Sequence, residues 1–143
     1  MSSDSAIQGS LIPLSRQQAM LILEAGYLWA DLGMFDKALE TLQGAATLMP
    51  KSEVPQLALG SLELSRGQPE KALQAFRAAQ KLAPRSGLPR ANAGEALLFM
   101  GKAAEALKEL KAAQELEPSG DGAKLAEALL QAHEAGAFPA KKK

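Results

Sequence analysis

The chain has 143 residues, with 16 basic and 16 acidic side chains, one histidine and no cysteine. This length suffices for one domain with a buried core. Zero cysteine excludes a disulfide scaffold and a thiolate metal site, and zero net charge argues against nucleic acid as a partner, because phosphate binding needs a basic surface. No apolar run reaches the roughly 18 residues of a membrane span, and no signal peptide is recognisable. We therefore expect a cytoplasmic protein without membrane insertion.

The composition favours helices over strands. The chain contains 28 alanines and 24 leucines, but only one valine, three isoleucines and two threonines. Alanine and leucine are the best helix formers, whereas strands are enriched in β-branched and aromatic residues. An all-α fold is predicted.

The first predicted helix follows an N-terminal segment, residues 1–14. This segment is expected to be flexible apart from its apolar stretch 10–14, which should pack on the protein's own surface or on a second copy, as a possible homodimer. Ser15 and Gln18 then have the spacing of a capping box, which predicts a helix that begins near Arg16.

The main part of the chain is a threefold repeat. Residues 19–52, 53–86 and 87–120 align without a gap at a period of 34 residues. Six positions hold the same residue in all three copies: Gly26, Gly60 and Gly94; Gly33, Gly67 and Gly101; Ala38, Ala72 and Ala106; Ala45, Ala79 and Ala113; Leu48, Leu82 and Leu116; and Pro50, Pro84 and Pro118.

The repeated residues predict two helices in each repeat. The second glycine, as in Gly33, fits a tight turn between them that needs positive φ. The proline, as in Pro50, ends the second helix because proline cannot continue one. The first glycine and the alanines are small and permit close helix contact. Large apolar residues should fill the core: Trp29, Phe35, Leu39, Leu42, Leu59, Leu73, Phe76, Leu97, Leu107 and Leu110.

One further helix is predicted after the repeats, over residues 121–135. Leu125 and Leu129 should face inward, and the outer face carries Lys124, Glu127, Gln131 and Glu134. A terminal unit of a repeat protein needs such a polar outer face. The repeats and this capping helix make one domain, residues 15–135, followed by a flexible tail, residues 136–143.

The 34-residue pattern resembles the tetratricopeptide repeat (TPR) family. The resemblance implies three helix-turn-helix repeats in a right-handed superhelical solenoid, with the first helix of each repeat lining a concave groove that binds peptides. Carried over by position, the groove residues are Met20, Leu23, Tyr27, Val54, Leu57, Ser61, Leu64, Ser65, Leu88, Ala91, Asn92, Glu95, Leu98 and Phe99. Most are apolar, so an extended apolar peptide is the expected ligand.

A subset of TPR domains uses a clamp of basic and amide side chains to grip the acidic C-termini of heat-shock chaperones. At the matching positions this chain has Leu23, Tyr27, Ala58, Leu88 and Asn92. A desolvated carboxylate needs charged donors. Such a ligand is therefore not expected.

No catalytic constellation is recognisable in the sequence. His133 is the only histidine, and no cysteine or carboxylate cluster accompanies it to complete a metal site. The glycines recur at the repeat period, which is not the spacing of a phosphate-binding loop. We expect no enzyme activity, no metal and no cofactor.

A narrower resemblance points to the small TPR chaperones of bacterial type III secretion, of the YscY and LcrH types. The matching residues are 14–18 with Leu21, Leu23 and Gly26, then Pro89, Arg90, Ala93, Glu95, Leu97 and Leu98, and 113–116. The resemblance implies a chaperone that holds a secretion substrate or an export subunit. The alternative is a TPR scaffold subunit of a larger cytoplasmic assembly without a chaperone role.

Overall fold

A computed structural model describes residues 14–139, which form seven α-helices and no strand. In chain order the helices are α2 (Arg16–Asp31), α3 (Phe35–Leu48), α4 (Val54–Ser65), α5 (Pro69–Leu82), α6 (Leu88–Phe99), α7 (Ala103–Leu116) and α8 (Asp121–Glu134). The predicted all-α fold is confirmed. Residues 1–13, with most of the apolar stretch 10–14, and residues 140–143 lie outside the described part, and the proposed domain limits stay a prediction.

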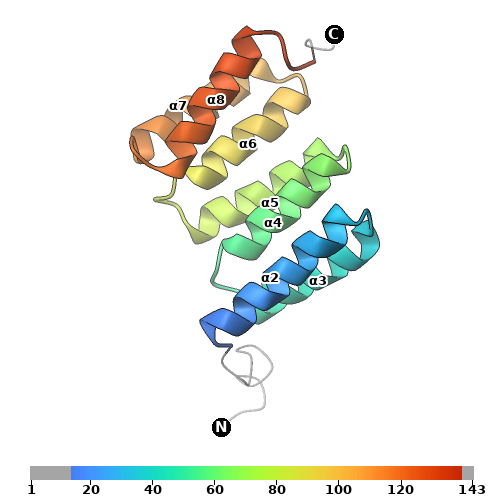
Figure 1. Cartoon of the computed structure of the whole chain (residues 1–143). Helices are drawn as coiled ribbons and strands as arrows, with labels where there is room; N and C mark the ends of the chain where they lie inside the picture. Colours follow the sequence, from blue (N-terminus) through green and yellow to red (C-terminus); the bar gives the residue numbers. More distant parts are fainter. Residues whose placement is uncertain (1–13, 140–143) are drawn as a thin grey trace.

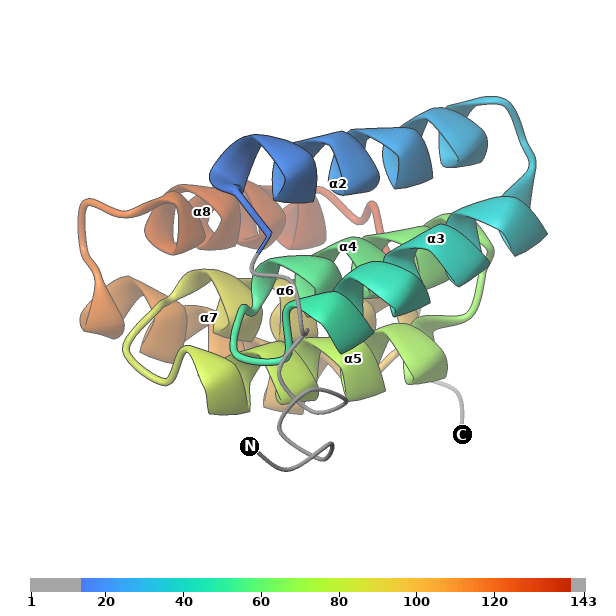
Figure 2. The same cartoon turned by 90° about the horizontal axis from the view of Figure 1, so that it is seen from below.

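The helices form two layers (Figure 1). The first helices of the three repeats, α2, α4 and α6, lie in one layer, and the second helices, α3, α5 and α7, lie behind them. When the stack is viewed along the layers, α2 and α8 lie above α4 and α6 at opposite ends (Figure 2). The first layer therefore presents a concave face.

The local signals in the sequence set the helix ends. Gly33, Gly67 and Gly101 sit in the turns between paired helices with φ of 75°, 74° and 76°, values that disfavour a side chain. At the start of α2, the Gln18 amide donates to Ser15 Oγ at 3.1 Å and the Ser15 amide donates to Gln18 Oε1 at 2.9 Å. The predicted turns and the capping box are confirmed.

The two helices of each repeat pack through the first repeated glycine. A methyl group on Gly26 would lie 2.5 Å from Leu42 Cδ2, and one on Gly60 would lie 2.2 Å from Phe76 Cε1. Gly94 stands in the same relation to Leu110, at 2.6 Å. Leu42, Phe76 and Leu110 are fully buried. The large residue of the second helix thus occupies the space that the glycine of the first helix leaves.

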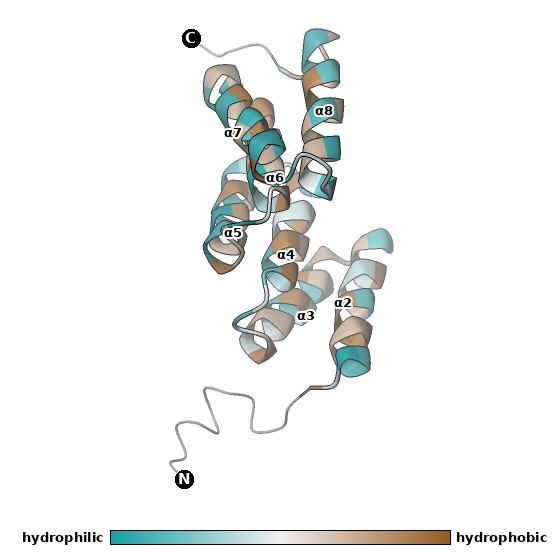
Figure 3. Cartoon of the chain, turned by 90° about the vertical axis from the view of Figure 1, so that its left-hand side faces the viewer, coloured by the Kyte–Doolittle hydropathy of each residue, from teal (hydrophilic) through white to brown (hydrophobic). Residues whose placement is uncertain are grey.

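The two ends of the stack differ. At the C-terminal end, Ala126 and Leu129 of α8 are buried, whereas the predicted outer residues, such as Lys124 and Glu127, are exposed. At the N-terminal end, hydrophobic positions recur along α2 (Figure 3), and Leu21, Leu28 and Leu32 are 63%, 58% and 61% exposed. Only the C-terminal end carries a polar cap among the described residues.

One expected core residue lies on the surface. Leu107 of α7 is 38% exposed, so its assignment to the core was wrong. It directly follows Ala106, which is fully buried, and it falls on the outer side of that helix because each successive helical position is rotated by about 100°.

Adding a methyl group at Gly60 should destabilise the fold. Gly60→Ala forces Phe76 out of its position, and overpacking of this kind costs about 1–3 kcal/mol. The matched control is Gly44→Ala in α3, where no heavy atom lies within 4 Å of the added carbon; it should stabilise by up to about 1 kcal/mol through helix propensity. Urea unfolding measures both changes, and an unchanged midpoint for Gly60→Ala would contradict the packing described here.

Candidate functional site

A pocket of about 590 Å³ opens on the concave face, between α2 and the start of α4. Its lining consists of Arg16, Ala19, Met20, Leu23, Glu24, Tyr27, Met49, Ser52 and Val54. Four of these residues, Met20, Leu23, Tyr27 and Val54, were predicted groove residues. The loop residues Met49 and Ser52 were missed, because the repeat frame placed ligand contacts on the first helices only.

The pocket lining is mainly apolar and accessible. Met20 is 50% exposed, Tyr27 45% and Val54 38%, whereas Leu23 is half-buried against the core of the first repeat. Partial burial raises the pKa of the Tyr27 phenol. A phenol is protonated at neutral pH even without this shift, so the Tyr27 hydroxyl can donate a hydrogen bond. Arg16 and Glu24 are exposed charged residues of the same pocket.

The predicted groove residues of α4 combine half-buried leucines with exposed serines. Leu57 and Leu64 pack against the buried cluster around Phe76. Ser61 and Ser65 are exposed, but the Ser65 hydroxyl donates to the Leu62 carbonyl oxygen at 2.7 Å. α4 therefore offers a surface of partly covered leucines edged by hydroxyl groups.

On α6 the structure removes two predicted residues from the accessible surface. Ala91 and Leu98 are fully buried in one cluster with Ala126 and Leu129 of α8. A side chain at Gly122 would meet the backbone at Gly87, so α8 lies directly against the start of α6. The expectation that Ala91 and Leu98 line an open groove is corrected, because α8 covers this face of α6.

The remaining predicted residues of α6 lie apart from the concave pocket. Leu88, Asn92 and Glu95 are half-buried. Phe99 contacts Phe138 edge-to-face, with 5.1 Å between the ring centroids, and it lines a separate pocket of about 410 Å³ that includes Pro139. The sequence analysis missed Phe138. It could have been recognised as a large aromatic residue in a segment of small residues.

Neither a metal site nor a membrane span is found in the described part of the chain. Between residues 14 and 139, no group of three or more histidine, cysteine, aspartate or glutamate side chains could hold a metal ion. None of the seven helices there is long and apolar enough to cross a membrane.

Comparison with known proteins supports the repeat assignment. A family model described as tetratricopeptide repeat matches residues 56–86, within the second predicted repeat. The prediction of tetratricopeptide repeats is thereby confirmed, and the chain has the fold of a TPR solenoid. No curated protein matches the chain in sequence.

Solved structures with the same fold include chaperones of type III secretion. PcrH from Pseudomonas aeruginosa is 23% identical, with a TM-score of 0.73 over 87% of this chain and 96% of PcrH. The type III secretion chaperone SycD of Yersinia enterocolitica, in complex with a peptide of the translocator YopD, is 21% identical, with a TM-score of 0.70 over 85% and 96%. The predicted likeness to these chaperones is confirmed at the level of fold.

The same fold also occurs outside secretion. The first TPR domain of Spaghetti (RPAP3), bound to an HSP90 peptide, is 22% identical, with a TM-score of 0.66 over 83% of this chain and 98% of that domain. At such identities the likeness establishes the fold alone.

Replacing Glu95 should remove a pH dependence of stability. Burial raises the pKa of the Glu95 carboxyl above its ordinary value of 4.5, so the folded protein binds this proton more tightly than the unfolded chain does. Its contribution to stability is therefore lost as pH rises through the folded-state pKa. Glu95→Gln should unfold at a higher temperature than the parent protein at pH 7 and at the same temperature at pH 3.5, as measured by circular dichroism. A lower melting temperature of Glu95→Gln at pH 7 would contradict this account.

Proposed function

We propose that the protein binds an extended, mainly apolar segment of a protein partner on its concave face. The observation that carries this proposal is the pocket of about 590 Å³ in which Met20, Leu23 and Tyr27 of α2 meet Val54 of α4. Exposed apolar surface of this kind marks interaction sites, and an exposed aromatic residue in a pocket is a frequent energetic anchor. The serines of α4 extend the site along the concave face.

We further propose that the partner is a secretion substrate or an export subunit, and that the protein acts as a cytoplasmic chaperone of type III secretion. Two observations support this role. The fold matches PcrH and SycD over most of each chain, and SycD is known in complex with a translocator peptide. The concave pocket also carries uncharged side chains such as Leu23 and Tyr27, which suit an apolar segment better than an acidic terminus.

The alternative role, a TPR scaffold subunit of a larger assembly, does not require binding at the concave pocket. A scaffold can hold its neighbours through the outer layer, for example around Arg77 or Lys108. A chaperone of the proposed kind needs the concave pocket. The location of residues whose replacement abolishes partner binding therefore separates the two roles.

Truncating the aromatic side chain in the concave pocket should weaken partner binding. We expect Tyr27→Ala to raise the Kd about 30-fold, since an aromatic anchor contributes roughly 2 kcal/mol when truncated. Met20→Asp, which puts a charge on the same surface, should have a similar effect. Affinity capture from native cells and mass spectrometry identify the partner, and calorimetry with the purified partner measures the Kd.

The matched control for these variants is Leu107→Asp on α7, which changes an exposed apolar residue of the outer layer. It should leave the Kd unchanged. All three variants should keep the helical signal of the parent protein, because each replaced side chain is more than one third exposed. If Tyr27→Ala and Met20→Asp bind normally while Leu107→Asp does not, the concave site is refuted and the scaffold role gains support.

We also propose that residues 10–14 contribute to a homodimer. This stretch contains Leu11, Ile12 and Leu14, and α2 exposes Leu21 and Leu28 at the end of the stack; joining two such apolar surfaces would remove both from water. Deleting residues 1–13 should shift the protein from dimer to monomer in sedimentation velocity. A full-length chain that sediments as a monomer at about 100 μM would refute the dimer, because even a weak dimer with a Kd of about 100 μM would be populated at that concentration.

A further inference from the structure

A basic pocket of about 380 Å³ lies between α5 and α6, at the interface of the second and third repeats. Three of its lining residues are Arg77, Lys81 and Arg90, and the others are Gln80 and Pro84. Among the described residues no carboxylate lines this pocket, and it shares no lining residue with the concave pocket. A pocket whose charged lining is entirely positive attracts an anion.

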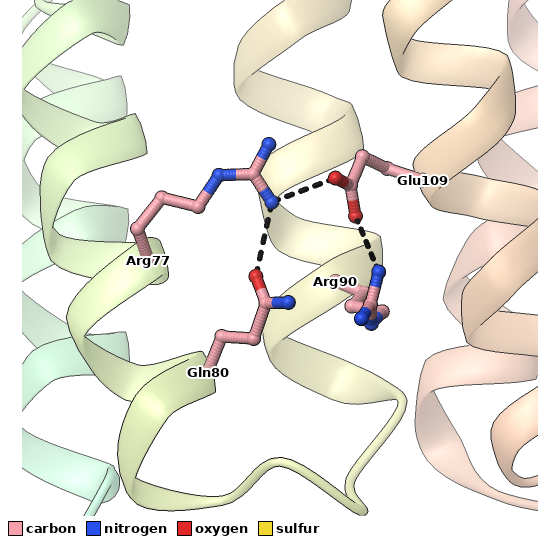
Figure 4. A network of polar contacts seen from close by, with 4 residues as sticks. All are labelled: Arg77, Gln80, Arg90 and Glu109. Carbon is pink, nitrogen blue, oxygen red and sulfur yellow. Dashed lines mark hydrogen bonds and ion pairs between the residues drawn. The ribbon is translucent and has the colours of Figure 1, made fainter.

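Glu109 of α7 holds the two arginines of the basic pocket in place. Its Oε1 accepts from Arg77 Nη1 at 2.7 Å and its Oε2 accepts from Arg90 Nη1 at 3.4 Å (Figure 4). Arg77 Nη1 also donates to Gln80 Oε1 at 2.9 Å. The two guanidinium groups are therefore fixed close to each other before any ligand binds, which reduces the entropy that binding costs.

Several donors of the basic pocket have no partner among residues 14–139. They are Nε and Nη2 of Arg77, Nη2 of Arg90 and the ammonium group of Lys81. Arg90 Nε is buried and closed to the pocket, so it does not serve a ligand there. The three positive charges of the lining and the negative charge of Glu109 leave a net charge of +2 (3 − 1).

The fold does not require this concentration of positive charge. At the same positions of the repeat, 34 residues away, the first interface has Gln43, Thr47 and Gln56, and the α6–α8 end has Lys111, Glu115 and Lys124. The first set is uncharged, and the second contains a carboxylate. Arg77 and Lys81 are also four residues apart on α5, and like charges at this spacing destabilise a helix. A ligand that neutralises them would explain why they stand together.

The charge and the donors of the basic pocket fit a phosphate group. A phosphate monoester carries a charge of about −1.5 to −2 at neutral pH and offers three strong acceptor oxygens. This charge balances the net charge of the pocket, and each oxygen can accept from one of the three basic side chains. Arginine pairs are well suited to phosphate because the planar guanidinium donates two parallel hydrogen bonds. A single carboxylate would leave one positive charge without compensation.

The size and the remaining lining indicate what carries the phosphate. One water molecule fills about 30 Å³, so a pocket of about 380 Å³ has room for a phosphate group and for the residue that bears it. Pro84 is the one apolar residue of the described lining. The aromatic ring of a phosphotyrosine would find little apolar surface there, whereas the short side chain of a phosphoserine needs none.

We propose that the basic pocket binds a phosphoserine side chain of a protein partner, with Arg77, Lys81 and Arg90 as the residues that contact the phosphate. Phosphorylation of the partner then strengthens its attachment to the second and third repeats. The site has no residue in common with the concave pocket, so the proposal does not depend on the proposed function.

The test uses NMR titrations of the full-length, isotope-labelled protein in a chloride buffer of constant ionic strength at about pH 7.5, where a phosphate monoester is a dianion. The probes are N-acetyl-O-phospho-L-serine N-methylamide, N-acetyl-L-glutamate N-methylamide and inorganic phosphate. We expect the phosphoserine probe to give saturable shifts of the Arg77 and Arg90 side-chain N–H signals and of the Lys81 backbone amide. Its Kd should be about 10-fold lower than that of the glutamate probe, and lower than that of inorganic phosphate.

Two charge-reversal variants on α5 connect the response to the pocket. Lys81→Glu places the residue of the third repeat at this position, and the exposed side chain makes it compatible with the fold. It should raise the Kd of the phosphoserine probe about 10-fold or more, because a carboxylate then faces the phosphate. The matched control is Lys71→Glu, an equally exposed lysine about 15 Å away along the helix. At about 0.15 M salt this distance screens the charge, so the Kd should not change.

The proposal is overturned if the phosphoserine probe shifts none of these signals up to about 10 mM, since a ligand of this size has a typical Kd of about 1 mM or below. Inorganic phosphate that binds as tightly as the phosphoserine probe would make free phosphate the ligand and overturn the assignment to a partner's side chain. Equal affinity for the glutamate probe, or equal weakening by Lys81→Glu and Lys71→Glu, would reduce the pocket to a general attraction of anions and overturn the proposal as well.

Discussion

The close contact between the two helices of each repeat is the constraint on which the rest of the structure depends. The first helix of each repeat has no side chain at Gly26, Gly60 or Gly94. The space beside each glycine is filled by a side chain of the second helix: Leu42, Phe76 or Leu110. Because the same contact between a glycine and a large apolar side chain recurs three times at the same spacing, the three repeats have nearly the same shape. Stacking these similar units then produces the two layers and the concave face of the first layer.

The concave face is not uniform along the stack, because the two ends are finished differently. At the C-terminal end, α8 packs on α6 and removes Ala91 and Leu98 from the surface, and Phe138 packs against Phe99. At the N-terminal end no described helix covers α2, and Met20 and Tyr27 stay accessible. Among the predicted groove residues the exposed apolar ones therefore lie on α2 and at the start of α4, with Phe99 at the end of α6 as the exception, although the repeat pattern distributes apolar residues over all three repeats.

The two interfaces between repeats also differ from each other in their polar contacts. Between the second and third repeats, Glu109 joins Arg77 to Arg90, and this connection is partly buried. Between the first and second repeats the equivalent residues are Gln43, Gln56 and Ala75, and a pocket that they line lies there. Both interfaces keep a pocket, of about 370 and 380 Å³, but among the described residues an ion pair bridges only the second (Figure 4). The side chains at three positions change while the backbone pattern does not.

The sequence by itself determined the features that depend on neighbouring residues or on strict periodicity. The turns at Gly33, Gly67 and Gly101, the capping box at Ser15 and the pairing of small with large residues follow from backbone conformation and from a spacing of 34 residues. Only the tertiary structure decided which apolar residues stay accessible: Ala91 and Leu98 have the same apolar character as Met20 and Leu23, but α8 covers them. The physical reason is that exposure depends on contacts between residues far apart in the chain, and those contacts leave no local pattern in the sequence.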